Sequence, residues 1–167
     1  FEAADGAWFA PVARLSLALF DTTQPMHELG AREREWLEFS ALLHDIGKHI
    51  SYEAHHKHSY YLIRHGGLRG FDPEEVEIIG LVARYHRQAT PKKAHEGFAS
   101  LSRGLQQTVK ILGAMLRLAE GLDRSHAQTV GVMKAVAHRD RLLIHLRAKG
   151  DAELELFARP AVVVRFS

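Results

Sequence analysis

Apolar residues recur with a helical period along the first three quarters of this chain. The segment from 31 to 43 places Trp36, Leu37 and Leu43 on or near one face, with charged residues between them. The segment from 103 to 122 carries the longest such pattern, and segments near 9–20, 55–64 and 73–86 carry shorter ones. We therefore expect five or six helices that pack against one another.

Polar and turn-forming residues predict where these helices begin and end. Asp21-Thr22-Thr23 is expected to stop the first helix, so that residues 24–29, which include Pro25, form a loop. Gly47 is expected to end the second helix in a left-handed turn. Asp72 followed by Pro73 is typical of an N-cap and a first helical position.

The pattern changes after residue 128. Residues 129–137 and 141–148 are rich in β-branched residues and alternate loosely, which predicts a hairpin around His138-Arg139-Asp140. Residues 153–157 and 161–166 are expected to add one or two strands. The predicted fold class is mainly α: a helical bundle of five or six helices followed by a small antiparallel β-sheet. We expect one domain over residues 1–167, helical over 8–126 and with the sheet over 129–166.

The composition limits which residues can bind a metal and whether the chain can span a membrane. The chain has no cysteine, so any bound metal must be held by His, Asp or Glu. It has no stretch of 18 uninterrupted apolar residues, so no membrane span is expected. Both features fit a cytoplasmic protein.

Positive charge gathers in one part of the sequence. The formal net charge is only +2, yet eight of the 12 histidines lie between residues 44 and 95, together with many lysines and arginines. Such a surface favours anionic partners, above all phosphate, although a simply solvated basic face is the alternative. The candidate phosphate-binding residues are Lys48, His55, His56, Lys57, Arg84, Arg87, Lys92, Lys93 and Arg124.

The most informative motif is the adjacent pair His44-Asp45, which follows an apolar helix and precedes Gly47 and Lys48. An imidazole beside a carboxylate suits a divalent metal, which needs about four to six ligands. His58, His86 and Asp123 are the candidates for the remaining ligands, since each lies near a helix end. We expect His58 to point inward, and His55 and His56 outward. Alternatively, these are satisfied polar residues at helix termini, where histidine also favours the dipole.

Several other functions are disfavoured. The sequence contains no GxxxxGK[ST] loop, GxGxxG turn, GxSxG elbow or HExxH helix. The sequence gives little support for nucleic-acid binding, because the aromatic residues do not interleave with the basic ones. Tyr52, Tyr60, Tyr61 and Tyr85 are interpreted as core or edge residues.

Four segments resemble a known family: LLHDIGKHISYEAHHKHSYYLI, GFDPEEVEIIGLVARYHR, PKKAHEGFASLS and LRLAEGLDRSH. Their order and spacing are similar to those of the C-terminal HD-type helical domain of the exopolyphosphatase / guanosine pentaphosphate phosphatase family. The resemblance implies two preceding actin-like domains, which carry the catalytic carboxylate and are absent from this sequence. It also implies a basic channel for the phosphate chain, and hydrolysis of inorganic polyphosphate or guanosine pentaphosphate with magnesium.

In the wider HD superfamily, the resemblance implies metal ligands at His44, Asp45 and Asp123, with His58 and His86 similar to the additional histidines of some branches. The superfamily's upstream histidine should fall near Trp8 or Phe9, and neither can bind a metal. Three hypotheses remain open. The chain is a substrate-binding domain of a phosphoanhydride hydrolase, an independent hydrolase with Mg, Mn, Fe or Zn at the His-Asp site, or a packing module that forms a homodimer. In the second hypothesis, Lys48 or Arg87 neutralises charge on the phosphate.

Overall fold

The computed structural model describes residues 10–87, 90–92, 95, 97–123, 130–138 and 141–148. The described chain is mainly helical, as the hydrophobic pattern predicts. Its elements are α1 (Ala10–His27), α2 (Ala31–Leu43), the short 3₁₀ helix η2 (Ile46–His49), α3 (His55–His65), α4 (Pro73–Arg84), α5 (Arg103–Leu122), β1 (Val130–His138) and β2 (Arg141–Ala148). The predicted strands at 153–157 and 161–166 lie outside the described residues.

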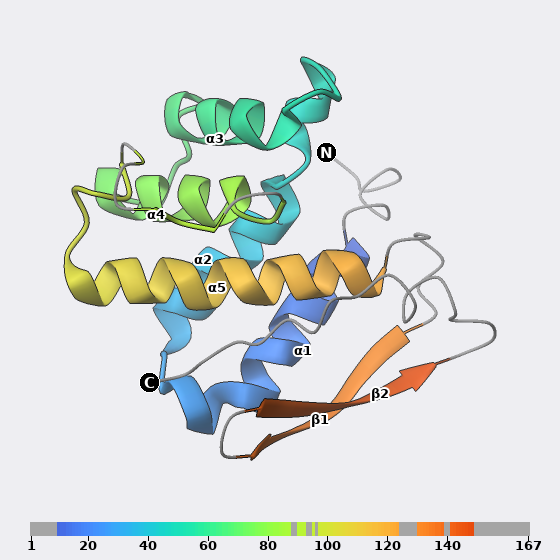
Figure 1. The fold of residues 1–167 in the computed structure, drawn as a ribbon. Coiled ribbons are helices and arrows are strands. Elements are labelled where there is room, and N and C mark those ends of the chain that lie inside the picture. Colours follow the sequence, from blue (N-terminus) through green and yellow to red (C-terminus); the bar gives the residue numbers. More distant parts are fainter. Residues whose placement is uncertain are drawn as a thin grey trace.

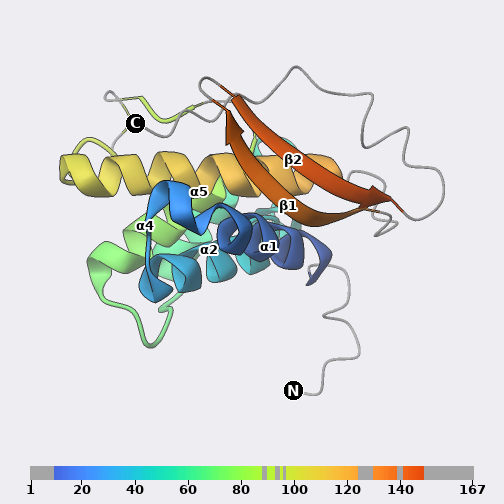
Figure 2. The same cartoon turned by 90° about the horizontal axis from the view of Figure 1, so that it is seen from below.

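The helices form layers that place the start of α3 near the end of α4. In Figure 1, α3 lies on α4 and α4 lies on α5, while α1 and α2 pack behind and below α5. Strands β1 and β2 pair in antiparallel register from Val130↔Ala148 to His138↔Arg141, with an irregularity between Val132 and Lys134. This hairpin lies at the opposite side of the molecule from α3 (Figure 1), and β1 packs against α1 (Figure 2).

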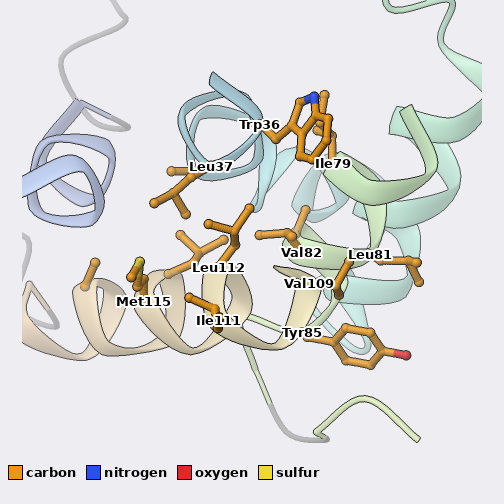
Figure 3. Close-up of a cluster of buried hydrophobic side chains, with 14 of the residues drawn as sticks. Trp36, Leu37, Ile79, Leu81, Val82, Tyr85, Val109, Ile111, Leu112 and Met115 are labelled. Carbon is orange, nitrogen blue, oxygen red and sulfur yellow. The ribbon is translucent and has the colours of Figure 1, made fainter. Parts of the chain in front are cut away.

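The hydrophobic core lies between α2, α4 and α5. Leu37, Val82 and Leu112 are completely buried, and they meet from these three helices (Figure 3). Burial of side chains of this size contributes roughly 1.5–3 kcal/mol each. Tyr85 is the residue after α4 and belongs to this buried cluster (Figure 3), and its backbone carbonyl accepts a hydrogen bond from Arg117 of α5 at 2.8 Å. The core therefore fixes the end of α4, from which His86 follows directly.

The first helix is longer than the sequence predicts. Helix α1 continues through Asp21-Thr22-Thr23 and Pro25 to His27, so the predicted stop is wrong and only the last two residues of the predicted loop, 28 and 29, lie outside a helix. Both threonine hydroxyls donate to carbonyls four residues earlier, Thr22 to Ala18 at 2.7 Å and Thr23 to Leu19 at 2.7 Å. These bonds satisfy the threonine hydroxyls inside the helix. Elsewhere such hydroxyls bond to the local backbone in ways that compete with helical hydrogen bonds.

Gly47 does not adopt the predicted left-handed turn. Helix α2 ends at Leu43, as predicted, but Gly47 lies within η2 and is not among the residues with positive φ. Its role is close approach: a Cβ there would lie 2.2 Å from the His55 carbonyl oxygen and 2.4 Å from the Ser59 nitrogen. The missing side chain therefore lets the turn after α2 lie directly against the start of α3.

A buried serine fixes the same contact. The Ser59 hydroxyl donates to the His44 carbonyl at 2.6 Å and accepts from the Gly47 N–H at 2.9 Å. Ser59 is fully buried, so both bonds are shielded from water. The His44–Gly47 turn is thereby held against α3, and with it the carboxylate of Asp45.

Helix α4 begins as predicted. The Asp72 side chain accepts a hydrogen bond from the Glu75 N–H, and the Glu75 side chain accepts one from the Asp72 N–H. Pro73 occupies the first helical position. The helix ends at Arg84 rather than at His86, two residues before the expected end. His86 consequently lies in a turn, where its ring is free to face α2 and α3.

Candidate metal centre

Three histidine rings are oriented in the same way at this site. In His44, His55 and His86, the Nδ1 atom lies 2.6, 3.0 and 2.6 Å from the backbone carbonyl three residues earlier, belonging to Ala41, Tyr52 and Ala83. A carbonyl oxygen only accepts, so each Nδ1 carries the proton and donates it. In the neutral ring, Nε2 then presents a lone pair, which is the state in which histidine binds metals.

The Nε2 atoms converge on the carboxylate of Asp45. His55 Nε2 and His86 Nε2 lie 3.2 and 3.9 Å from Asp45 Oδ1, and 3.2 Å from each other. His44 Nε2 lies 3.5 Å from Asp45 Oδ2. All four side chains are buried, and Asp45 Oδ1 accepts no hydrogen bond from the part of the chain that the structure describes. Within that part, Asp45, His55 and His86 form a group with ligand atoms within 4.8 Å of one another.

These distances fit one divalent ion. Two ligands about 2.1 Å from a shared ion lie about 3–3.4 Å apart at octahedral or tetrahedral angles. The two contacts of 3.2 Å fall in this range. When the rings are neutral, the same contacts bring lone pairs together, an arrangement that a cation stabilises. The residues present therefore fit a bound metal.

The electrostatics keep the ligands in metal-binding protonation states. Burial, reinforced by the neighbouring His44 and His55, lowers the pKa of His86 to about 3. Burial also lowers the pKa of His44. For Asp45, burial opposes ionisation, but His44, Lys48 and His86 outweigh it and hold the pKa of the carboxyl below its usual value. At neutral pH, His44 and His86 are thus neutral imidazoles and Asp45 is a carboxylate.

Positive charge borders this site. The Lys48 ammonium pairs with Asp45 Oδ2 and lies 5.8 Å from the centre of the Tyr52 ring. The Arg87 guanidinium approaches the same ring at 5.7 Å, from the residue after His86. Tyr52 is 68% exposed, so this border faces solvent. Lys48 and Arg87 therefore place positive charge at the solvent-facing border of the site.

The predicted orientations on α3 are wrong. His55 and His56 are buried, whereas His58 is only half-buried. The reason is the tight packing of Gly47 against α3, which turns the first residue of the helix toward Asp45. His55, expected on the surface as a phosphate ligand, therefore joins the metal group, and His58 is outside it within the described chain.

The other predicted site residues lie in several environments. Asp123 is 1% exposed and follows α5, but it is not part of the described metal group. Arg84 is half-buried, whereas Lys57, Arg87 and Lys92 are exposed. Lys93, Arg124, Trp8 and Phe9 lie outside the described residues. Tyr52 was interpreted from sequence as a core or edge residue, but it lies at the border of the site. Its place in the sequence just before the histidine cluster could have indicated this position.

Within the residues described, no helix is long and apolar enough to cross a bilayer. The fold and the site define a helical domain with a buried centre of histidines and a carboxylate, bordered by cations. Comparison with known families matches residues 5–157 to Ppx/GppA phosphatase, domain III. The chain therefore belongs to the Ppx/GppA phosphatase family, which confirms the resemblance seen in its sequence.

Two curated relatives carry the same name, guanosine-5'-triphosphate,3'-diphosphate pyrophosphatase. The protein of Pseudoalteromonas atlantica (strain T6c / ATCC BAA-1087) is 29% identical over 109 residues, which are 65% of this chain and 21% of the relative. The protein of Pseudoalteromonas translucida (strain TAC 125) is 33% identical over 72 residues, 43% of this chain and 14% of the relative. The matched part thus spans about a fifth or less of each relative's length.

Proposed function

We propose that this chain is an HD-type, C-terminal domain of a phosphohydrolase that cleaves phosphoanhydride bonds in guanosine pentaphosphate or inorganic polyphosphate. In this proposal, the domain binds the phosphate chain of the substrate, while the actin-like domains of the parent enzyme carry the catalytic carboxylate. The family membership and the names of the two relatives support the substrate class. A cytoplasmic location belongs to the same proposal.

The observation that carries the proposal is the convergence on Asp45 of three imidazoles whose Nδ1 atoms are hydrogen-bonded to backbone carbonyls. Lys48 and Arg87 lie beside them. His44, Asp45, His55 and His86 would hold a divalent metal. Once bound, such an ion supplies polarisation of a phosphoryl oxygen and a lowered pKa of bound water. Lys48 and Arg87 would neutralise the phosphate oxygens that reach the site from solvent.

The wider cationic face supports binding of a chain rather than of a single phosphate group. Lys57, Arg84 and Lys92 extend the positive charge from Arg87 over α3, the end of α4 and the segment that follows it. A polyanion that follows this face would exchange its bound counterions for protein cations, which makes its affinity depend strongly on salt.

The test is binding of long-chain polyphosphate to the purified chain at low salt. We expect binding that weakens steeply with added salt and falls at least tenfold when Arg87 and Lys92 are both changed to Glu. A double charge reversal at exposed positions outside this face, Arg69→Glu with Arg103→Glu, serves as the matched control. Absence of binding, or equal losses in the double variant and the control, would refute the proposal.

A second candidate is a metal-dependent phosphohydrolase that acts without the actin-like domains. One observation favours it: His55 supplies a histidine ligand, although the upstream position near residues 8 and 9 offers none. Hydrolysis of polyphosphate or of a nucleotide by the isolated chain, lost in His55→Ala, would establish it. If the chain binds neither metal nor polyphosphate yet forms a stable dimer in light scattering, the homodimeric packing module is the better account.

A further inference from the structure

One face of helix α5 meets the end of α4 at Tyr85. Gly113 lies on that face, where a Cβ would lie 3.5 Å from the Tyr85 Cβ, so the glycine lets the two helices come into contact. Arg117 is four residues further along α5 and therefore lies on the same face. Its guanidinium donates twice to the Tyr85 carbonyl oxygen, from Nη2 at 2.8 Å and from Nε at 3.3 Å. A side chain of α5 thus holds the backbone directly before His86.

The Tyr85 carbonyl needs such a donor because it lies at the end of a helix. Carbonyls at the C-terminal end of a helix have no N–H partner within that helix, and they form its negative pole. Tyr85 is the C-cap residue of α4. A guanidinium satisfies this oxygen and also interacts favourably with the helix dipole. Burial lowers the pKa of Arg117, so the cation is placed there at a cost that these hydrogen bonds help to offset.

The same bonds orient the peptide unit that joins Tyr85 to His86. This unit is planar, so holding its carbonyl oxygen and its N–H fixes the plane. Arg117 holds the oxygen, and the His86 N–H donates to the Ala83 carbonyl at 3.4 Å. The His86 Nδ1 donates to the same Ala83 carbonyl at 2.6 Å. The backbone and the ring of His86 are therefore fixed together, with Nε2 lying 3.2 Å from His55 Nε2.

The other two histidines of the site have their backbones fixed by different contacts. His55 lies within α3, and the His44 carbonyl accepts a hydrogen bond from the Ser59 hydroxyl at 2.6 Å. His86 is fully buried but lies beyond the end of α4. Arg117 supplies for His86 the support that Ser59 supplies for His44.

We propose that Arg117 is a positioning residue of the metal centre, whose hydrogen bonds to the Tyr85 carbonyl orient His86 for binding the ion. This inference rests on the proposed function, and it adds a residue that supports a metal ligand rather than being one. Removing a partner that orients a metal ligand typically costs roughly 10- to 100-fold in metal affinity. Because Arg117 acts on His86 through one peptide unit, we expect an effect at the lower end of this range.

The experiment measures the affinity for Co²⁺ and the visible absorption of bound Co²⁺. Arg117→Met keeps the stem and removes the donors, so it should lower Co²⁺ affinity about tenfold and change the absorption bands, which report the ligand geometry. Arg117→Lys keeps a cationic donor and should hold the affinity within about threefold of the unaltered chain, with an unchanged spectrum. The matched control is Arg32→Gln, which removes a guanidinium that joins α2 to Glu75 of α4. It should change neither measurement.

A second measurement needs no metal. Nitrogen NMR of the metal-free chain reports which ring nitrogen of His86 carries the proton. The unaltered chain, Arg117→Lys and Arg32→Gln should show only the form protonated at Nδ1, whereas Arg117→Met should show both forms. If Arg117→Met does not fold, Arg117→Gln replaces it in both measurements.

The positioning role is overturned if Arg117→Met keeps the affinity, the spectrum and the ring protonation of the unaltered chain. Equal changes in Arg32→Gln, or no recovery in Arg117→Lys, would overturn it as well. Failure of the proposed function gives a different result. If the unaltered chain binds no Co²⁺, the metal centre is wrong, and the ring protonation of His86 still decides whether Arg117 orients it.

Discussion

Two groups of arginines in this domain differ in whether they have acidic partners. Arg34 pairs with Asp21 at 2.8 Å, Arg64 with Glu77 at 3.1 Å, and Arg32 with Glu75. By contrast, Arg84 and Arg87, at the end of α4, form no ion pair with any described residue. The first group joins helices to one another, whereas the second leaves positive charge uncompensated beside a buried metal-type site. The partnered arginines thus stabilise the helix packing, whereas Arg84 and Arg87 are the arginines that the proposed function assigns to an anionic ligand.

The largest expected effect comes from disturbing the close contact between Gly47 and α3, which joins the helix packing to the site. Gly47→Ala should lower the free energy of unfolding by about 3 kcal/mol or more, because its Cβ would collide with the backbone of α3. Urea denaturation monitored by circular dichroism measures this change. The control is Gly104→Ala in the first turn of α5, where a Cβ would make only an ordinary contact of 4.0 Å with the Ser102 hydroxyl; stability there should stay equal or rise by up to about 1 kcal/mol. Equal effects at both glycines would contradict the packing described for η2.

Acid should destabilise the metal-free chain well above the range in which carboxylates titrate. The folded pKa of His86, about 3, lies below its ordinary value of 6.5, so the unfolded chain binds the proton that the folded chain excludes. Stability is therefore complete above pH 6.5 and falls as the pH drops from 6.5 toward 3. Thermal unfolding in chelator between pH 4 and 8 measures the slope. His86→Gln should flatten it and the exposed His65→Gln should not; a flat profile in the unaltered chain would contradict this account.

The smallest effect is expected for a partnered arginine. Arg64→Gln removes an exposed ion pair, so it should lower stability by about 1 kcal/mol or less. Polyphosphate affinity should remain within twofold of the unaltered chain, because Arg64 is already engaged with Glu77. Denaturation and titration on the same sample separate the two effects. A tenfold loss of affinity would place Arg64 in the binding surface and remove the contrast between the two groups.

The sequence predicts much of the helical frame, because its signals are local. Helices α2 and α5 begin and end where periodicity places them, and Asp72-Pro73 starts α4. The extension of α1 was missed because Thr22, Thr23 and Pro25 resemble a stop, while hydroxyl bonds to the preceding turn satisfy them inside the helix.

The site was predicted only in part, since its geometry depends on tertiary contacts. His44, Asp45 and His86 could be proposed from their places at helix ends. The choice between His55 and His58 could not be made from spacing, because both lie on one face of a helix. Packing of Gly47 on α3, together with the Ser59 hydroxyl, decides in favour of His55.

The most direct test of the metal centre is elemental analysis of the purified chain and of two single-histidine variants. We predict about one equivalent of divalent metal in the unaltered chain and in His58→Ala. In His55→Ala we predict little or no bound metal, because removing a direct ligand should cost more affinity than the roughly 10- to 100-fold cost of removing an outer-shell partner. Metal retained in His55→Ala but lost in His58→Ala, or none bound by the unaltered chain after metal loading, would contradict the account.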